Sequence, residues 1–189
     1  FDIERTTARA EILKALGLPH SALLIITVGN ISYRKQQLEA VKALAIIHTV
    51  VPNAHLILAG SIVDESHKQE IVDTINMENM SDKVHLIGCS DKIPQLLAAS
   101  DIYIHTSDRE GHPRSVIEAM AARLPVIAYD IDGVHECLEN GIGILVPLGN
   151  TQVLADNLQK LLDSVELRRR YGMLGYQHVV QNYMSEHTA

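Results

Sequence analysis

The chain has 189 residues, of which 47% are apolar and 21% are charged, and its formal net charge is -7. This length allows one domain with a sizeable core, and the composition excludes a disordered or low-complexity protein. The acidic balance argues against a nucleic-acid-binding surface, which needs clustered Lys and Arg.

Short apolar, β-branched runs alternate with stretches of helical periodicity, a pattern typical of strand and helix units around a parallel sheet. The first element is a helix at residues 7–16, which ends at Gly17 and which Pro19 prevents from continuing. Strands are then expected at residues 23–28, 55–59, 83–87, 102–105, 126–129 and 144–146. The helices expected after them span residues 35–50, 65–77, 93–99, 115–122, 134–138 and 151–162, and a last helix spans residues 166–182.

This order of elements predicts an α/β fold with a doubly wound, six-stranded parallel sheet, Rossmann-like in its strand order 3-2-1-4-5-6. Such a sheet reverses its order between strands 1 and 4, and ligands bind there, beyond the carboxyl ends of the strands. We therefore expect the functional residues in the loops after strands 1 and 4, at residues 29–35 and 107–115.

The loop after strand 4 leads into a helix and is the most informative stretch of the sequence. Gly111 allows a ligand to approach the backbone, Pro113 suits the first helical turn, and Ser115 is a candidate cap. Free N–H groups near Ser115 and Val116 would face the crevice, where a helix N-terminus favours a phosphate or pyrophosphate. Glu118, one turn further, either accepts hydrogen bonds from a ribose diol or only stabilises the helix dipole.

Glu110, Gly111, Pro113 and Glu118 resemble the motif of the retaining glycosyltransferases of the GT-B fold, in which two glutamates flank a Gly-x-Pro. The resemblance extends along nearly the whole chain. Its further segments are Val28-Gly29 with Lys35, residues 52–60, 84–88, 98–107 and 125–127, Gly133 with Glu136, and residues 141–147. The match is to the C-terminal domain only, so the chain resembles the nucleotide-sugar donor half of a GT-B enzyme of the glycosyl transferases group 1 family.

The resemblance implies roles for individual residues. Lys35 would bind the donor pyrophosphate and Glu110 would lie against the transferred sugar, so both are candidate catalytic residues. Glu118 would hold the ribose. The other candidate donor-binding residues are Asn30, Arg34, Gly111, His112, Pro113, Ser115, Val116, Gly133 and Glu136.

Three positions depart from the family pattern. Asn30 stands where a phosphate-binding Arg is usual, and Arg34 is a candidate substitute for that Arg. Gln36 replaces a Gly that commonly follows the Lys. Asp132 replaces the first Gly of a turn that faces the sugar in the family, and it either tunes the choice of sugar or crowds the loop.

No metal ion or other cofactor is expected, because a Lys and helix N–H groups can stabilise a diphosphate leaving group by themselves. Asp130-Ile131-Asp132 resembles the metal-binding D-x-D of the other major glycosyltransferase fold, but the glutamate motif belongs to the metal-independent class. The ten histidines show no metal-ligand spacing, so His20, His55 and His105 are expected to be structural.

The cysteine content and one basic run bear on the location of the protein. Cys89 and Cys137 indicate neither a disulfide framework nor a thiolate zinc site, which favours a cytoplasmic setting. No apolar run approaches the roughly 20 residues of a membrane span. The run Arg168-Arg169-Arg170 is either a solvated helix face or a peripheral contact with an anionic membrane, which would place the full-length protein at the inner face of a membrane.

We therefore predict a single donor-binding domain at residues 1–189 that binds a nucleoside-diphosphate sugar. Transfer to a glycan or lipid-linked acceptor would need an N-terminal acceptor domain absent from this chain, which begins at Phe1 as an excised fragment would. The alternatives are a sugar-nucleotide epimerase of the same fold, a glycosidase with Glu110 and Glu118 as its carboxylate pair, and a non-catalytic nucleotide-binding module.

Overall fold

The computed structural model describes residues 4–183. Its six parallel strands form one sheet in the order β3-β2-β1-β4-β5-β6, which confirms the predicted order. The strands are β1 (Leu23–Val28), β2 (Ala54–Ala59), β3 (Val84–Gly88), β4 (Ile102–His105), β5 (Val126–Tyr129) and β6 (Ile144–Val146). β1 pairs with β2 on one side and with β4 on the other, so the order of connection reverses beside β1.

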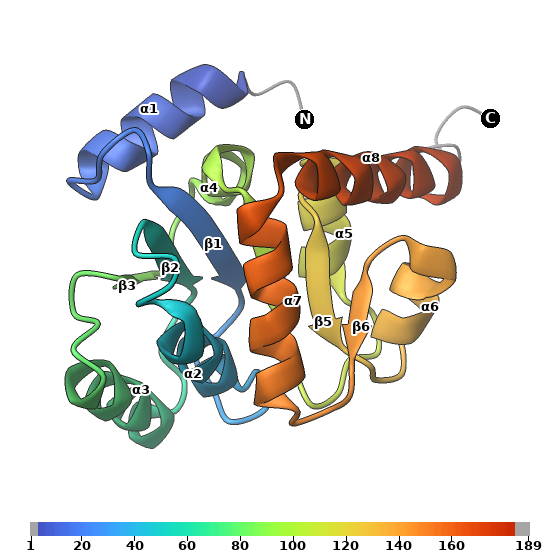
Figure 1. The fold of residues 1–189 in the computed structure, drawn as a ribbon. Coiled ribbons are helices and arrows are strands. Elements are labelled where there is room, and N and C mark those ends of the chain that lie inside the picture. The colour runs from blue at the N-terminus through green and yellow to red at the C-terminus, as the bar shows by residue number, and fades with distance from the viewer. Residues whose placement is uncertain (1–3, 184–189) are drawn as a thin grey trace.

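Helices cover both faces of this sheet (Figure 1). They are α1 (Arg5–Ala15), α2 (Gln37–Ile47), α3 (Glu65–Met77), α4 (Ile93–Ala99), α5 (Arg114–Ala121), α6 (Val134–Leu138), α7 (Thr151–Asp163) and α8 (Val165–Asn182), with a 3-10 turn at Glu139–Gly141. α2, α3 and α7 pack on one face, and α1, α4, α5 and α6 pack on the other. α8 contacts both layers, through Leu167 and Tyr171 on the first and through Val179 on the second. Within residues 4–183, no helix combines the length and the apolar character needed to cross a bilayer.

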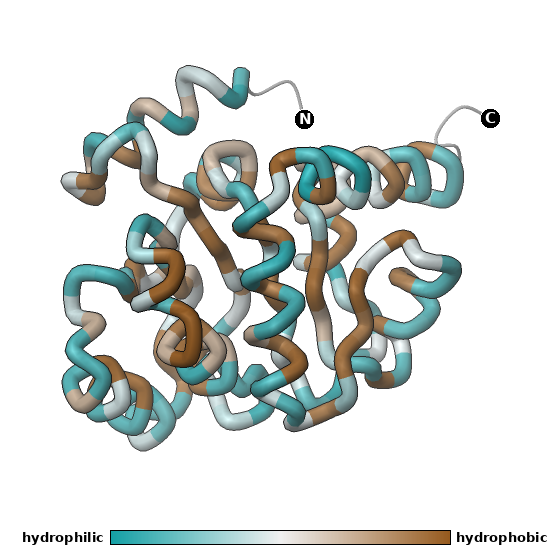
Figure 2. The backbone as a smooth tube through the Cα atoms, in the orientation of Figure 1, coloured by the Kyte–Doolittle hydropathy of each residue, from teal (hydrophilic) through white to brown (hydrophobic). Residues whose placement is uncertain are grey.

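Two hydrophobic layers hold the helices to the sheet. Neighbouring strand residues point to opposite layers: Ile25 and Leu56 contact the layer of α2, α3 and α7, whereas Leu24 and Ile57 contact the other layer. All four side chains are fully buried, and burial of one such side chain stabilises the fold by about 1.5–3 kcal/mol. Figure 2 shows hydrophobic residues concentrated in the strands, whereas hydrophobic and hydrophilic residues alternate along most helices.

The start of α2 differs from the prediction. A turn occupies residues 33–36, because Gln36 adopts a left-handed conformation with φ 47° and ψ 41°, which cannot continue into a right-handed helix. Lys35 therefore precedes α2 instead of lying in its first turn. Glycine adopts this conformation without steric cost, which gives a physical reason for the Gly that the family pattern has at this position.

Two glycines allow loops at the carboxyl edge of the sheet to touch. A Cβ atom at Gly60 would lie 2.0 Å from the carbonyl oxygen of Gly29, so the loops after β1 and β2 can approach this closely only with glycine there. A Cβ atom at Gly133 would lie 2.6 Å from the carbonyl oxygen of Glu110, and Gly133 also has a φ of 76°. The loop after β5 is thus packed directly against the loop after β4.

Candidate functional site

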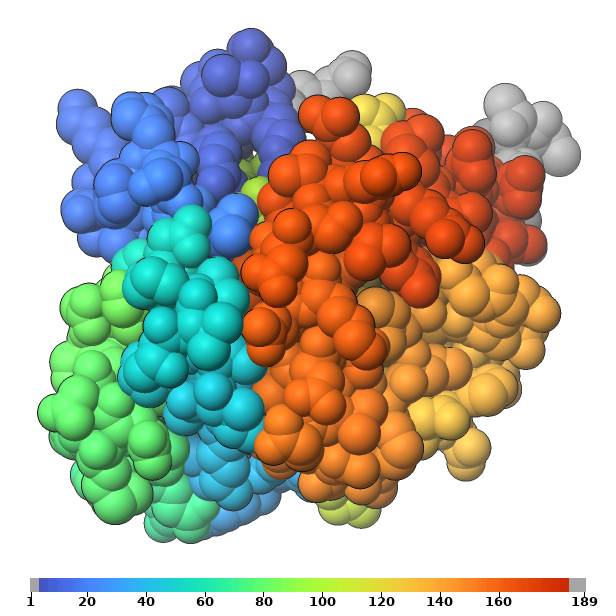
Figure 3. Space-filling view, viewed as in Figure 1, coloured from blue at the N-terminus to red at the C-terminus, as the bar shows by residue number. Residues whose placement is uncertain are grey.

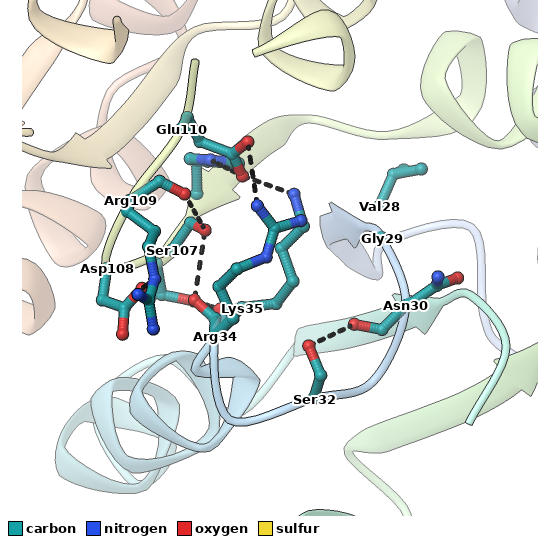
Figure 4. A network of polar contacts seen from close by, with 12 residues as sticks. Val28, Gly29, Asn30, Ser32, Arg34, Lys35, Ser107, Asp108, Arg109 and Glu110 are labelled. Atoms are coloured by element: carbon teal, nitrogen blue, oxygen red, sulfur yellow. Dashed lines mark hydrogen bonds and ion pairs between the residues drawn. The ribbon is translucent and has the colours of Figure 1, made fainter. Parts of the chain in front are cut away.

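The loops after β1 and β4 meet at the carboxyl edge of the sheet, beside the point where the strand order reverses. The N–H of Asp108 and the hydroxyl of Ser107 both donate to the carbonyl of Arg34, at 3.0 and 3.1 Å. The hydroxyl of Thr106 donates to the carbonyl of Lys35 at 2.9 Å. These bonds anchor the turn, so the side chains of Arg34 and Lys35 project from a fixed backbone (Figure 4).

Glu110 lies at the centre of a basic cluster (Figure 4). Its side chain is 8% exposed and forms an ion pair with Lys35, whose side chain is 16% exposed. Arg34 Nη1 lies 3.9 Å from Glu110 Oε2, and His105 Nε2 lies 3.3 Å from Glu110 Oε1. The His105 contact is close enough for electrostatic interaction, but its alignment is too poor for a well-formed hydrogen bond.

Opposing effects set the protonation of Glu110. Burial raises the pKa of this carboxyl group, but its polar contacts with His105, Lys35 and Ser107, together with the charge of Lys35, outweigh burial and lower the pKa to about 2. Burial lowers the pKa of His105 below its ordinary value, so the imidazole is neutral at pH 7. Glu110 is therefore a carboxylate at neutral pH, which can accept hydrogen bonds but cannot donate a proton.

A cavity of about 240 Å³ opens beside this cluster, between the loop after β1 and the start of α5. Its lining residues are Val28, Gly29, Lys35, Glu110, His112, Pro113, Arg114, Ser115 and Glu118. Two segments that lie far apart in the sequence thus contribute to one cavity. Six of the predicted site residues share it: Lys35, Glu110, His112, Pro113, Ser115 and Glu118.

The N-terminus of α5 forms one wall of this cavity, through Pro113, Arg114 and Ser115. One expectation about its free N–H groups is wrong: the N–H of Val116 donates to the carbonyl of Pro113 at 2.9 Å, because the first turn of the helix is tightened. The N–H of Arg114 likewise donates to the carbonyl of His112 at 2.9 Å. The partial positive charge of the helix N-terminus still faces the cavity, because it arises from the aligned peptide groups of the helix as a whole.

A second cavity, of about 600 Å³, lies on the other side of Glu110. Its lining residues are Arg34, Asp108, Arg109, Glu110, Gly111, Ile131 and Asp132. The larger cavity therefore contains Arg34 and Gly111 of the predicted site, together with Asp132, which departs from the family pattern. Asp108 and Arg109 also line it and form an ion pair at 3.1 Å, a contribution that the sequence pattern did not single out.

Four predicted residues are not among the lining residues of either cavity: Asn30, Val116, Gly133 and Glu136, of which Val116 is fully buried. The exposed side chain of Asn30 lies apart from the Lys35 and Glu110 cluster (Figure 4), while its carbonyl accepts a hydrogen bond from Gln37 at 2.9 Å. Gly133 contributes its backbone, which packs on the carbonyl of Glu110. Glu136 is exposed on α6 and is not among the residues that line either cavity.

His105 is a residue whose place in the site the sequence did not reveal, because it was expected to be only structural. It is the last residue of β4 and is 2% exposed, directly against Glu110. The available signal was its position, since the final residue of a strand at the switch point lies at the ligand-binding edge.

Metal-ligating side chains do not cluster in the part of the chain that the structure describes. Among residues 4–183, no group of three or more His, Cys, Asp or Glu side chains is arranged to hold a metal ion. Asp130 instead contacts His135, with 2.6 Å between Asp130 Oδ1 and His135 Nδ1.

Comparison with known sequences connects this geometry to a family. The family model described as glycosyl transferases group 1 matches residues 8–178. An N-acetyl-alpha-D-glucosaminyl L-malate synthase of Bacillus anthracis is 30% identical over 177 residues, which are 93% of this chain and 45% of that protein. An alpha-D-kanosaminyltransferase of Streptomyces kanamyceticus is 27% identical, over 89% of this chain and 44% of that protein. The chain therefore spans less than half the length of these relatives.

Solved structures share the fold. HepE of Anabaena in complex with UDP superposes with a TM-score of 0.87 at 25% identity, over 94% of this chain and 49% of that chain. The C-terminal domain of a glycosyl transferase group 1 family protein from Francisella tularensis has a TM-score of 0.83 at 24% identity, over 95% of this chain and 93% of that chain.

Proposed function

Because this chain belongs to the glycosyl transferases group 1 family, we propose that it is the donor-binding domain of a retaining glycosyltransferase that uses a nucleoside-diphosphate sugar. The observation that carries the proposal is the single cavity lined by Lys35, Ser115 and Glu118. It brings together a cation, a helix N-terminus and a carboxylate, which are suitable partners for a pyrophosphate joined to a ribose.

The charge distribution suits the chemistry of transfer. Cleavage of the bond between the anomeric carbon of the sugar and the diphosphate leaves growing negative charge on the diphosphate. Lys35 and the start of α5 are fixed before the reaction, and such preorganised positive charge is usually the largest single contribution to lowering a barrier. In this proposal Lys35 and Ser115 bind the diphosphate and Glu118 binds the ribose.

Glu110 lies between the two cavities, where the transferred sugar would extend from the diphosphate. Its pKa of about 2 keeps it ionised, so we assign it the role of accepting hydrogen bonds from sugar hydroxyl groups and stabilising positive charge on the sugar ring. Gly111 and Gly133 would bring backbone groups close to the same sugar. Asp132, in the wall of the larger cavity, would influence which sugar is accepted.

The proposal also covers the choice of nucleotide and whether donor binding needs a metal ion. HepE has been solved with UDP and with UDP-glucose, which supports UDP as the first nucleotide to test. Lys35 and the helix N-terminus supply positive potential, so we propose that donor binding is independent of a divalent ion.

The acceptor and its domain lie outside this chain in the proposal. Since the chain spans less than half of its relatives, we propose that an N-terminal domain supplies the site for a glycan or lipid-linked acceptor. We place the full-length enzyme in the cytoplasm, with a peripheral contact at the inner face of a membrane.

Two rival functions are separated by one pair of measurements. Calorimetry with UDP, GDP and ADP on the 189-residue chain tests nucleotide binding, and a transfer assay on the full-length protein tests catalysis. We expect binding of one diphosphate by the chain and transfer with retention by the full-length protein. Binding without transfer would favour a nucleotide-binding module, whereas rearrangement of the donor without an acceptor would favour an epimerase.

A further inference from the structure

Five of the nine arginines of the chain gather at the edge of the sheet opposite to the donor cavity, near the amino ends of β4 and β5. A cavity of about 470 Å³ lies there, and its charged lining residues are Arg5, Asp101, Arg123, Arg168 and Arg169. The fifth arginine, Arg9, forms an ion pair with Asp101 at 3.0 Å. This local concentration of positive charge contrasts with the net charge of -7 for the whole chain.

The positive charge in this cavity exceeds what its carboxylate can balance. Among residues 4–183, Asp101 is the one acidic residue that lines it, and both Arg5 and Arg9 already lie 3.0 Å from its oxygen atoms. Burial lowers the pKa of Arg168 below its ordinary value. The charge of Asp101 acts against this decrease, whereas the charges of Arg5 and Arg9 lower the pKa further. Arg168 is therefore near enough to the other arginines for mutual repulsion, which an anion in the cavity would relieve.

Arg168 and Arg169 differ in their hydrogen bonds. Arg168 donates to the carbonyls of Leu161 and Leu162, at 2.6 and 2.7 Å, at the end of α7. These bonds orient its guanidinium group, and both acceptors are neutral carbonyl groups. The side chain of Arg169 is exposed at the same cavity, where it is available to a ligand.

Arg123 holds an unfavourable backbone conformation at this cavity. It follows the end of α5 with a φ of 60°, at a position where the backbone usually has glycine. Its guanidinium carbon lies 4.4 Å from the ring centroid of Tyr176. Its backbone is in close contact with α8 at Gly172, where a Cβ atom would lie 2.2 Å from the Arg123 carbonyl oxygen. A left-handed non-glycine residue costs about 1 kcal/mol. The hydrogen bonds that end α5, from the N–H of Arg123 to the carbonyl of Met120 and from the N–H of Leu124 to the carbonyl of Ala119, hold it in place.

The rim of the cavity is partly apolar. Val165 and Met173 of α8 line it and are 54% and 45% exposed. The space-filling view shows a hollow between the blue surface of α1 and the orange start of α8 (Figure 3). The cavity thus combines basic walls with an apolar border.

We propose that this arginine cavity binds a phosphate group, carried either by a soluble phosphorylated molecule or by an anionic phospholipid headgroup. The planar guanidinium group presents paired N–H donors that match two phosphate oxygens, and arginines from α1, α8 and the end of α5 can approach one phosphate from different sides. The site lies at the amino edge of the sheet, so it does not depend on the donor cavity.

The test compares the 189-residue chain with a variant carrying both Arg123→Gly and Arg169→Gln. Arg123→Gly removes a guanidinium group and also relieves the left-handed backbone, so the variant should fold. Arg170→Gln is the matched control for Arg169→Gln, since it removes one positive charge from a neighbouring residue that is not among those lining the cavity. In the first measurement, inorganic phosphate is titrated and the amide resonances of Asp101 and Gly172 are followed by NMR. In the second, we measure sedimentation of the chain with phosphatidylcholine vesicles, with and without phosphatidylglycerol.

We expect saturable shifts at Asp101 and Gly172 in the parent chain, about tenfold weaker phosphate binding in the double variant, and binding within about twofold of the parent in the control. Sedimentation that requires phosphatidylglycerol and is lost in the double variant identifies the lipid headgroup, and phosphate shifts without sedimentation identify a soluble ligand. Absence of both effects in the parent overturns the proposal, as does an equal loss of binding in the Arg170→Gln control. UDP binding should be the same in all variants, which separates this proposal from that of the donor site.

Discussion

The ammonium group of Lys35 and the carboxylate of Glu110 form an ion pair that joins the loops after β1 and β4. The cation proposed to bind the donor diphosphate is therefore already paired with the residue proposed to contact the sugar. A donor must share Lys35 with Glu110, so Glu110 holds Lys35 in place and also competes with the diphosphate for it. This relationship determines what replacement of Glu110 should do.

Glu110→Gln should leave UDP binding unchanged or stronger, because it frees Lys35 and removes a negative charge from the cavity. Turnover of the full-length enzyme should fall on the order of 100-fold, since preorganised charge at the sugar is lost. Calorimetry and a transfer assay provide the two measurements. Full turnover in this variant would exclude Glu110 from the reaction.

Glu118→Ala should weaken UDP binding by about 1.5–3 kcal/mol, because a charge-assisted hydrogen bond to the ribose is lost. Glu118 is also near the N-terminus of α5, where an acidic residue stabilises a helix by roughly 0.3–1 kcal/mol. Thermal unfolding therefore serves as the control. A variant that melts earlier but binds UDP as the parent does would leave Glu118 with only the structural role.

Acid titration should reveal the depressed pKa of Glu110. Its pKa is about 2 in the folded chain against 4.5 for an ordinary glutamate, so the folded state binds this proton less readily than the unfolded state. The associated stability is fully present above pH 4.5 and is lost as the pH falls toward 2. Over this range the parent should lose on the order of 2 kcal/mol more stability than Glu110→Gln, as measured by urea unfolding. Parallel pH profiles would contradict the assignment.

Gln36→Gly should stabilise the chain by up to about 1 kcal/mol, because glycine adopts the left-handed conformation at this position without steric cost. The matched control is Gln69→Gly in the middle of α3, which should destabilise by about 1 kcal/mol. The midpoints of urea unfolding report both changes. A loss of stability in Gln36→Gly would mean that the Gln36 side chain makes a compensating contribution.

Removal of divalent ions should not change UDP affinity. Lys35 and the N-terminus of α5 provide the positive potential, so calorimetry with and without EDTA should give the same dissociation constant within error. A tenfold weaker affinity in EDTA, about 1.4 kcal/mol, would indicate a metal site instead and direct attention to Asp130 and Asp132.

The periodicity of the sequence was sufficient to predict the sheet, because each strand is a short apolar run. The four inner strands β1, β2, β4 and β5 are fully or largely buried, whereas the edge strands β3 and β6 are partly buried. The start of α2 was missed because the conformation of Gln36 depends on how its turn is anchored by Thr106 and Ser107. Lys35 and Glu110 could be assigned separately, but they are 75 residues apart, and nothing in their spacing reveals that they pair. Similarly, the sequence alone cannot show that the N–H of Val116 is used within its own helix turn.

Glu110 borders both the cavity of about 240 Å³ and the cavity of about 600 Å³, and this shared wall has a consequence for inhibitor design. A diphosphate mimic in the smaller cavity could be joined past Glu110 to a fragment that fits the charged walls of the larger one. A short linker holds a second fragment at an effective concentration in roughly the millimolar range, so even a weak fragment would add affinity. Linker length across Glu110 is therefore the first variable to optimise in a two-site ligand for this fold.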